Sequence, residues 1–161
     1  MSPGAPEVRV GIGYDSHTFA DASEDRKLIL GGVEIPHDRG LSGHSDADAL
    51  AHAIIDAVLG AAGLGDIGTH FPPTDERWRD ADSIELLKAV AGLIDGRVVN
   101  ADATVICEEP KIGPHREEME RRLSDALGAP VSVKATTNEG MGAIGRGEGI
   151  AAMAVASFEP A

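Results

Sequence analysis

Two residues suited to metal binding or acid–base chemistry, Asp15 and His17, lie two apart in the stretch EVRVGIGYDSHTF (7–19). The apolar residues of this stretch alternate with the others, at Val8, Val10, Ile12 and Tyr14. A period of two predicts a half-buried strand. Asp15 and His17 then share the opposite face, which is either part of a site or an ordinary solvated strand face.

A third candidate, His52, lies in SDADALAHAIIDAVLGAAG (45–63), which we expect to be a helix with Ser45 as its N-cap. Asp48 and Asp56 lie four residues either side of His52, in a polar stripe that a solvated helix face would also produce. Asp-x-His and one helical His supply three N or O ligands, the number that zinc takes when a fourth position stays open. A carboxylate of the stripe would then fix the tautomer of His52.

The segments on either side of this helix start hold further histidines. His44 lies in the loop GLSGHSDAD (40–48), just before the helix, where free backbone N–H groups and the helix dipole favour anions. An N-cap loop with an incidental histidine is the alternative. LGDIGTHFPPTDERWRDA (64–81) has no period, and a connection of this length is usually functional or mobile. We interpret His70 within it as exposed and inert.

Two later segments carry residues suited to phosphates. EEPKIGPH (108–115) contains Lys111, although a lone loop lysine is usually just solvated. KATTNEGMGAIGRGEG (134–149) places hydroxyls, an acid and an arginine among glycines, which let backbone N–H groups approach a phosphate closely. Glycine turns between strands are the alternative. The segment has no P-loop pattern, and GIG (11–13) lacks the helix that a dinucleotide fingerprint requires.

The elements that must position these residues suggest an α+β fold. KLILGGVEIP (27–36) reads as a β segment broken at two glycines, and helices are expected at 82–95 and 113–129. Further strands are expected at 98–110, 131–140 and 149–159. We therefore predict a mainly four-stranded sheet with helices packed on one face, plus a short β hairpin. Residues 1–161 would form a single domain with flexible ends at 1–6 and 160–161.

The composition excludes several classes of partner. The 161 residues carry 27 acids against 14 Lys and Arg, a net charge of −13, so nucleic acids and anionic membranes are not expected partners. The single cysteine, Cys107, cannot form an internal disulfide and excludes a cysteine-rich metal site. We expect a cytoplasmic protein, because this cysteine usage fits a reducing compartment and neither a signal peptide nor a membrane-spanning run is present.

Taken in order, four strings carry a resemblance to a known family. GYDSHTF, LGGVEIP, the run from GLSGHSDAD to PPTD, and KATTNEGMGAIGRGEGIA resemble the 2-C-methyl-D-erythritol 2,4-cyclodiphosphate synthase family, from about residue 7 to residue 158. The resemblance implies a homotrimer of α+β subunits with active sites between adjacent subunits. It implies a phosphorus–oxygen lyase of the non-mevalonate isoprenoid pathway. In this reaction the 2-phosphate of 4-diphosphocytidyl-2-C-methyl-D-erythritol 2-phosphate attacks the β-phosphate and releases CMP.

The resemblance also implies roles for particular residues. Three zinc ligands are expected, Asp15, His17 and His52. Glu139 is expected to bind a second divalent cation, Mg²⁺ or Mn²⁺. Two residues, His44 and Thr137, are expected to stabilise the transition state.

The implied substrate contacts fall into groups. The methylerythritol and ribose portions would lie against Asp66, Ile67, Gly68, Phe71, Pro72, Pro73, Thr74 and Asp75. A cytidine pocket that reads the base through backbone groups would comprise Cys107, Glu108, Glu109, Pro110, Lys111, Ile112 and Gly113. The diphosphate would lie against Thr136, Thr137, Asn138 and Glu139, and further contacts are expected from Asp15, Ser16, His17, His44, Ser45, Ala143 and Arg146.

Two of these residues lie near the expected trimer axis. Arg146, with Glu148, would belong to a charged ring. Ala143 stands where family members commonly carry a bulky Phe, beside an axial cavity that accepts isoprenoid diphosphates. The alternatives to the synthase are a zinc-dependent phosphohydrolase with the same three ligands, and a non-catalytic trimeric protein that binds nucleotides or isoprenoids.

Overall fold

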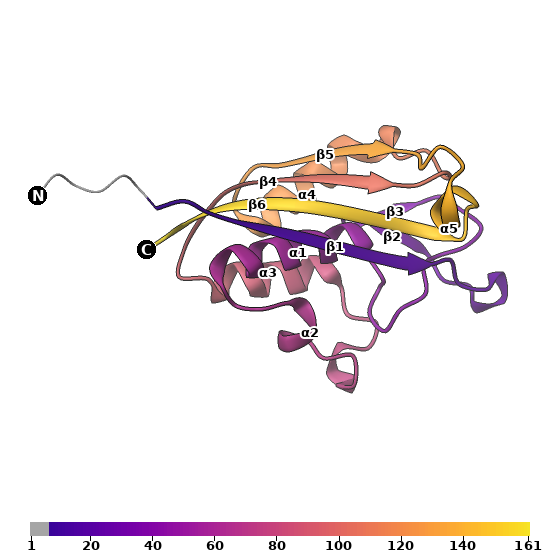
Figure 1. Cartoon of the computed structure of the whole chain (residues 1–161). Helices are drawn as coiled ribbons and strands as arrows, with labels where there is room; N and C mark the ends of the chain where they lie inside the picture. The colour runs from indigo at the N-terminus through magenta and orange to yellow at the C-terminus, as the bar shows by residue number, and fades with distance from the viewer. Residues whose placement is uncertain (1–6) are drawn as a thin grey trace, which may run out of the picture.

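A four-stranded mixed sheet forms one layer of the computed structural model, which describes residues 7–161 (Figure 1). The strands lie in the order β1 (Arg9–Thr18), β6 (Gly149–Pro160), β4 (Gly96–Ile106) and β5 (Val131–Thr136). β6 is antiparallel to both β1 and β4, whereas β4 and β5 are parallel. The predicted α+β class and four-stranded sheet are confirmed.

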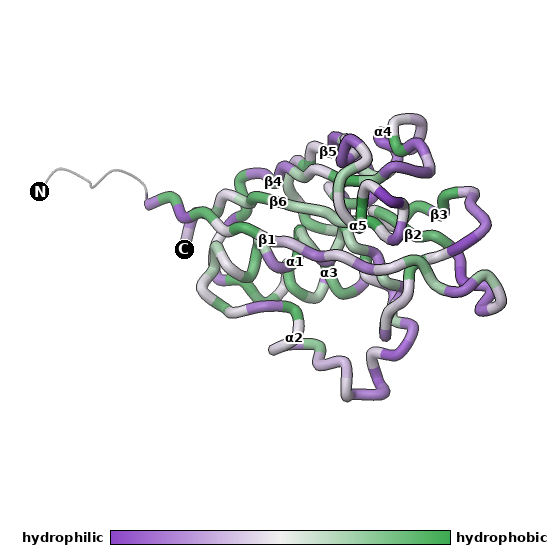
Figure 2. Tube along the Cα trace, turned by 45° about the vertical axis from the view of Figure 1, so that its right-hand side comes forward, coloured by the Kyte–Doolittle hydropathy of each residue, from purple (hydrophilic) through white to green (hydrophobic). Residues whose placement is uncertain are grey.

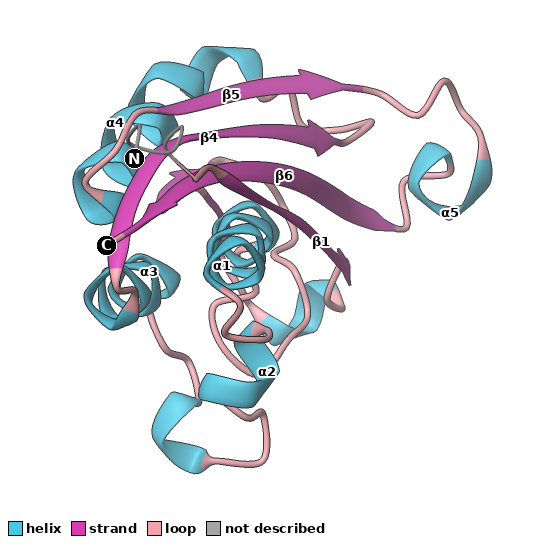
Figure 3. Ribbon diagram, turned by 60° about the vertical axis from the view of Figure 1, so that its left-hand side comes forward, coloured by secondary structure: helices cyan, strands magenta, loops and turns pink. Residues whose placement is uncertain are grey.

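Helices α1 (Ala49–Ala62), α3 (Ser83–Leu93) and α4 (Arg116–Leu127) lie on one side of this sheet, where α1 and α4 contact the strands and α3 packs against those two helices (Figure 3). α4 lies on the connection between the parallel strands β4 and β5, as a parallel pair requires. Figure 2 shows hydrophobic residues along α1 beneath the sheet and hydrophilic residues along the loop that follows α2 (Ile67–His70). In the described part of the chain no helix is long and apolar enough to cross a membrane.

Two glycines bring β1 into direct contact with α1. A Cβ at Gly13 would overlap the carbonyl oxygen of Ala53, and one at Gly11 would overlap that of Ala57. Neither position therefore tolerates a side chain at the observed distance between strand and helix. Because alternate residues of a strand share a face, this close approach also aims Asp15 and His17 at the helix.

The apolar side chains of β1 lie on its exposed face, although their alternation predicts that they are buried. Ile12 and Tyr14 are 68% and 57% exposed, and in the register of the sheet they lie opposite Val155 and Met153 of β6, which are also exposed. The buried side of the strand is the glycine side. The strand itself is confirmed, but the expectation that its apolar side is the buried one is wrong for a single chain.

The helix expected at 45–63 begins later than Ser45. Its N-cap is Asp48, which accepts a hydrogen bond from the N–H of Ala51 and also from those of Gly31 and Gly32. These two glycines, at φ of 58° and 72°, form the turn of the short hairpin β2 (Leu28–Leu30) and β3 (Val33–Ile35), the β hairpin that was predicted. One buried carboxylate therefore joins the hairpin to the start of the helix.

The remaining elements are short. They are the 3-10 helices η1 (Ala22–Glu24), η2 (Glu76–Trp78) and η3 (Gly113–His115), and the single-turn helices α2 and α5 (Gly142–Gly145). The segment 64–81 thus contains two helical turns joined by irregular chain. The expected flexible end at 1–6 lies outside the described residues. At the other end Pro160 of β6 pairs with Gly96 of β4, and Ala161 donates its N–H to the carbonyl of Asp95.

Candidate active site

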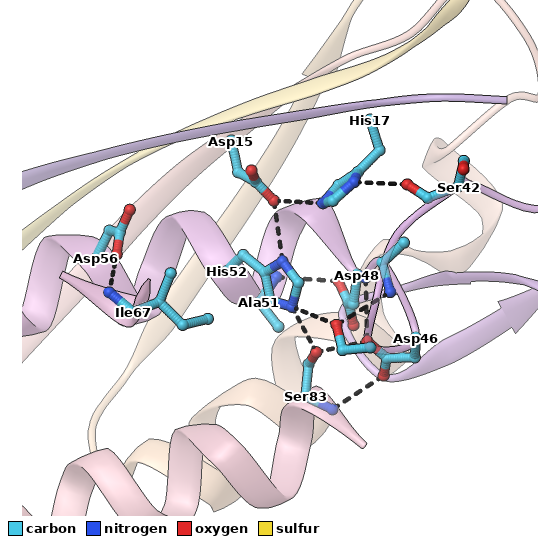
Figure 4. A network of polar contacts seen from close by, with 12 residues as sticks. Asp15, His17, Ser42, Asp46, Asp48, Ala51, His52, Asp56, Ile67 and Ser83 are labelled. Atoms are coloured by element: carbon cyan, nitrogen blue, oxygen red, sulfur yellow. Dashed lines mark hydrogen bonds and ion pairs between the residues drawn. The ribbon is translucent and has the colours of Figure 1, made fainter. Parts of the chain in front are cut away.

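β1 and α1 bring Asp15, His17 and His52 together, as Figure 4 shows. The Asp15 Oδ2 atom lies 2.8 Å from His17 Nε2 and 3.0 Å from His52 Nδ1. One oxygen and two nitrogens lie within 4.8 Å of one another. The strand therefore presents two candidate ligands and the helix the third.

The donor set fits a zinc ion. Two imidazole nitrogens and one carboxylate oxygen make up the protein part of a catalytic zinc site, whose fourth position stays open. Bonds of about 2.0–2.1 Å in tetrahedral geometry place neighbouring ligand atoms roughly 3.3 Å apart, so small side-chain shifts suffice here. The three atoms belong to partly or fully buried residues, and among residues 7–161 no other group of three or more such ligands gathers.

Each imidazole has a partner on the side away from Asp15. His17 Nδ1 lies 2.8 Å from the carbonyl oxygen of Ser42, which can only accept, so this nitrogen carries a proton. His52 Nε2 lies 2.8 Å from the hydroxyl of Ser83 and 3.2 Å from that of Ser45. Such partners hold the rings in the orientation that ligation needs.

The partner of His52 differs from the one predicted. Asp48 caps α1 and Asp56 accepts from the N–H of Ile67, so neither carboxylate of the helix stripe bonds the imidazole. Ser83, the first residue of α3, takes that role and is bonded in turn to Asp46. Sequence reasoning missed Ser83 because it lies 31 residues from His52, and no local spacing connects the two.

The electrostatics of the triad favour the charged carboxylate. Burial opposes ionisation of Asp15, but hydrogen bonds from His17 and His52 outweigh it and lower the pKa of Asp15 to about 2. Burial also disfavours a charged His52, but the hydrogen bond that His52 donates to Asp15 and the negative charges of Asp15 and nearby carboxylates together outweigh it, so the pKa of His52 is raised. The carboxylate is thus ionised and ready to bind a cation across the neutral pH range.

A cavity of about 250 Å³ opens over the triad. Besides the triad it is lined by His44, Ser45, Ile67, Gly68, Phe71, Pro73, Trp78 and Leu86. The first six of these belong to the predicted set. Trp78 and Leu86 were not predicted; the Trp78 ring packs edge-on against Phe71, with centroids 4.9 Å apart, and closes the apolar wall.

Some predicted residues lie beside this cavity without lining it. Asp66 caps α2 through the N–H of Thr69, and Asp75 binds Arg77 while its carbonyl oxygen lies 3.1 Å from His44 Nε2. Ser16 is exposed, since it lies on the face of β1 away from α1. Pro72 and Thr74 belong to the loop between α2 and η2.

A second cavity, of about 210 Å³, lies where β4 and β5 end. It is lined by Cys107, Glu108, Pro110, Lys111, Ile112, Gly113, Ala135, Thr136 and Thr137. Nearly the whole predicted cytidine pocket gathers here, whereas Glu109 is exposed. Burial and the charges of Glu109 and Glu108 raise the pKa of the Cys107 thiol to about 12, which disfavours the reactive thiolate near neutral pH.

A carboxylate holds the loop that follows β5. Glu108 accepts hydrogen bonds from the N–H groups of Asn138 and Gly140, at 2.9 and 3.2 Å. Between them Glu139 adopts a positive φ of 52° and is exposed. Ala143 and Arg146 follow at α5 and are also exposed, with Arg146 paired to Glu148.

The predicted site residues therefore form two groups in a single chain. The two cavities share no lining residue, and Glu139 joins no ligand cluster within the described residues. One group surrounds the candidate metal ligands, and the other surrounds the loop beyond β5.

An α+β fold with a carboxylate and two imidazoles lining one cavity has the construction of a metal-dependent enzyme. Residues 8–159 match the YgbB family. A 2-C-methyl-D-erythritol 2,4-cyclodiphosphate synthase of Rubrobacter xylanophilus is 60% identical over 158 residues, covering 95% of this chain and 96% of that protein. The chain belongs to the YgbB family.

Solved structures give the same result. The bifunctional IspDF of Campylobacter jejuni matches with a TM-score of 0.90 and 39% identity, over 98% of this chain and 43% of that one. IspF of Plasmodium falciparum in a CDP complex matches with a TM-score of 0.81 and 34% identity, over 98% and 99% of the two chains. The resemblance seen in the sequence is confirmed, and with it the prediction that this chain is a lyase-type enzyme.

Proposed function

We propose that this chain converts 4-diphosphocytidyl-2-C-methyl-D-erythritol 2-phosphate to 2-C-methyl-D-erythritol 2,4-cyclodiphosphate and CMP. The observation that carries the proposal is the triad of Asp15, His17 and His52 at the floor of a cavity, in a chain whose curated relatives are named for this synthase activity. The structural relative with CDP bound supports a cytidine nucleotide as ligand.

The reaction asks the protein mainly to position phosphates and neutralise their charge. The attacking 2-phosphate is ionised near neutral pH, so no general base is required. A protein of net charge −13 needs cations to hold such an anionic substrate. Zinc at the triad and a second divalent cation, when bound, would act as Lewis acids on phosphate oxygens.

The residues of the chain divide the remaining work. His44, whose Nε2 atom lies 3.1 Å from the Asp75 carbonyl, would orient and stabilise the reacting phosphate from the wall of the metal cavity. Ile67, Phe71 and their neighbours would hold the methylerythritol portion by apolar contact. At the second cavity Lys111 and its neighbours would read the cytosine through backbone groups, and Thr137 would contact the diphosphate and stabilise the transition state. Glu139, on the loop that Glu108 holds, would bind Mg²⁺ or Mn²⁺.

We further propose that the two cavities meet across a subunit interface in a homotrimer. Within one chain they are separate, although a single substrate would have to reach both. The exposed stripe on β1 and β6 (Val10, Ile12, Tyr14, Met153 and Val155) offers an apolar surface for such an interface. Burying it would remove from water the largest group of exposed apolar side chains on the sheet.

The test is to follow the purified protein with the diphosphocytidyl substrate by mass spectrometry. The proposal expects CMP and a cyclic diphosphate in equal amounts, with no inorganic phosphate. A zinc-dependent phosphohydrolase would release inorganic phosphate instead, and a non-catalytic binding protein would leave the substrate intact. Metal content measured on the same sample would show whether zinc occupies the triad, which is a separate part of the proposal.

A further inference from the structure

A hydrogen-bonded chain runs away from the candidate metal ligands into the protein, and the established family assignment gives it no role. It passes from His52 Nε2 to the Ser83 hydroxyl, 2.8 Å away, and from that hydroxyl to the Asp46 carboxylate (Figure 4). Ser83 is fully buried and His52 is only 8% exposed. Solvent therefore does not compete for the bond between His52 and Ser83, whereas Asp46 is partly exposed.

The hydrogen-bond donors in this network can be assigned by starting from the Asp46 carboxylate. An ionised carboxylate only accepts, so the Ser83 hydroxyl donates its single proton to Asp46. The Ser83 oxygen must then accept from His52, which places a proton on Nε2. With Nε2 committed to Ser83, Nδ1 is the ring atom left for a metal, which would displace the proton that Nδ1 donates to Asp15 in the metal-free protein.

We propose that Asp46 and Ser83 are positioning residues that hold His52 in the Nε2–H form, with Nδ1 aimed at the metal. The inference rests on the metal site of the proposed function and adds to it the residues that select the ligating nitrogen. Asp46 is itself held firmly, because its carboxylate also accepts from the backbone N–H groups of Ser83 and Asp48. The Ser83 hydroxyl, the Asp46 carboxylate and the two backbone N–H groups that bond it thus fix one imidazole.

The same contacts link the metal ligand to the wall of the cavity. Ser83 is the first residue of α3, and its N–H and hydroxyl both end on Asp46. The Asp46 N–H in turn donates to the carbonyl of Ala81, at the end of the irregular segment that carries Phe71 and Trp78. The start of α3 is therefore held in register with α1 at the level of His52.

Ser45 is the second hydroxyl near His52 and provides the internal comparison. It lies farther from Nε2, at 3.2 Å, and accepts from the N–H of Ala47 at 3.3 Å. No carboxylate fixes the direction of its proton. We therefore assign it a weaker part in selecting the tautomer than Ser83.

The experiment measures zinc affinity by competition with a chelator for the wild type, Ser83→Ala, Asp46→Asn and a control, Ser124→Ala. We expect zinc affinity to fall about 10–100-fold in the first two variants, the usual cost of losing an outer partner of a ligating histidine. Ser124 also bonds a backbone N–H, that of Val131, but lies on α4. Its loss should lower stability while zinc affinity stays at the wild-type value.

A second readout needs no variant. Nitrogen-15 NMR of the histidine rings in the wild-type protein should show His52 protonated at Nε2, with this proton slow to exchange with water. The signal should persist in the zinc-loaded protein, and in metal-free Ser83→Ala the neutral ring should shift toward the Nδ1–H tautomer, which Asp15 stabilises. A proton on Nδ1 in the zinc-loaded protein would overturn the inference, as would wild-type zinc affinity in Ser83→Ala.

These readouts separate the inference from the proposed function. If the wild type binds no zinc, the proposed metal site fails, while the tautomer of His52 in the metal-free protein still tests the hydrogen-bonded chain. If Ser83→Ala does not fold, Asp46→Asn and the wild-type spectrum carry the decision. Wild-type zinc affinity in Asp46→Asn, with an unchanged His52 signal, would count against the chain.

Discussion

The two cavities of this chain are built in different ways. The metal cavity lies between β1, α1 and α3, and the ring nitrogens of His17 and His52 all have polar partners. The cavity beyond β5 ends in an exposed loop whose Thr137 and Glu139 side chains face solvent. The first is enclosed by packed elements of this chain, whereas the second is bounded by an exposed loop.

Contact with a helix explains the difference, because β1 and β5 both lie at edges of the sheet. β1 and α1 are in contact along their length through Gly11 and Gly13, so side chains placed between them are buried and fixed. β5 is an edge strand, and the loop after it leaves the layer of helices. Its main support is the carboxylate of Glu108. An edge of this kind is completed by another surface, here proposed to be a neighbouring subunit.

The strongest test of this difference is to inactivate the metal cavity in one chain and the loop beyond β5 in another. His52→Ala and Glu139→Ala should each abolish activity, by removing a zinc ligand and the proposed ligand of the second cation. When the two variants are co-expressed in equal amounts, sites between subunits should regain about one quarter of wild-type activity, the share expected for random closed trimers. Sites contained within one chain would stay inactive in the mixture.

The two variants expressed apart and mixed without subunit exchange serve as the control for that experiment. They should show no activity at any ratio. Light scattering on the co-expressed sample should give the mass of three chains, and an active monomer at assay concentration would contradict the trimer.

A second prediction concerns how activity is lost when the metal cavity or the loop beyond β5 is altered. His44→Ala should lower kcat and kcat/KM together by about 10²–10³-fold, as for one lost donor that stabilises the transition state. Glu139→Gln should lower activity in a way that excess Mg²⁺ or Mn²⁺ partly restores, since the variant keeps the shape but weakens the cation site. Initial rates measured against added Mg²⁺ compare the two. Rescue of His44→Ala alone would reverse the assignment.

A substitution that loosens the loop beyond β5 should have a smaller effect, on the affinity for CDP. Glu108→Ala should weaken CDP binding about 10-fold, because the N–H groups of Asn138 and Gly140 lose their acceptor and the positive φ of Glu139 is no longer held. Glu108→Gln keeps one carbonyl acceptor and should lose less. Calorimetry with CDP gives both values, and zinc content should stay unchanged. Equal affinity for CDP in the wild type and Glu108→Ala would show that the loop keeps its conformation without Glu108.

The comparison also shows which parts the sequence could predict. The strands, the helices and the triad were predicted because each depends on local period or on a matched motif, and β1 with α1 then brings Asp15, His17 and His52 together. The apolar alternation predicted the wrong buried face of β1, because Gly11 and Gly13, rather than the apolar side chains, lie against α1. It missed Asp46 and Ser83 as partners of His52, because contacts between distant loops leave no periodic trace.

The last prediction has the smallest expected effect on activity and concerns stability. Burial and the nearby charge of Asp46 raise the pKa of Asp48 to about 6, although three backbone N–H groups oppose this. The folded protein then holds a proton on Asp48 that the unfolded chain has already released between about pH 4 and pH 6. The sign follows: this group makes the folded protein less stable as pH rises through that window, by at most about 3 kcal/mol.

The measurement is the free energy of unfolding from urea titrations at pH 4, 5, 6 and 7 for the wild type and Asp48→Asn. Because other carboxylates titrate in the same range, including Asp15 with its lowered pKa, only the difference between the two proteins isolates Asp48. The variant cannot ionise, but its amide nitrogen must face one of the N–H groups that the carboxylate accepts, so it should be less stable at pH 4. As pH rises to 7 the wild type should lose part of its advantage. A constant difference across the four pH values would show that Asp48 is ionised throughout, and that its hydrogen bonds outweigh burial.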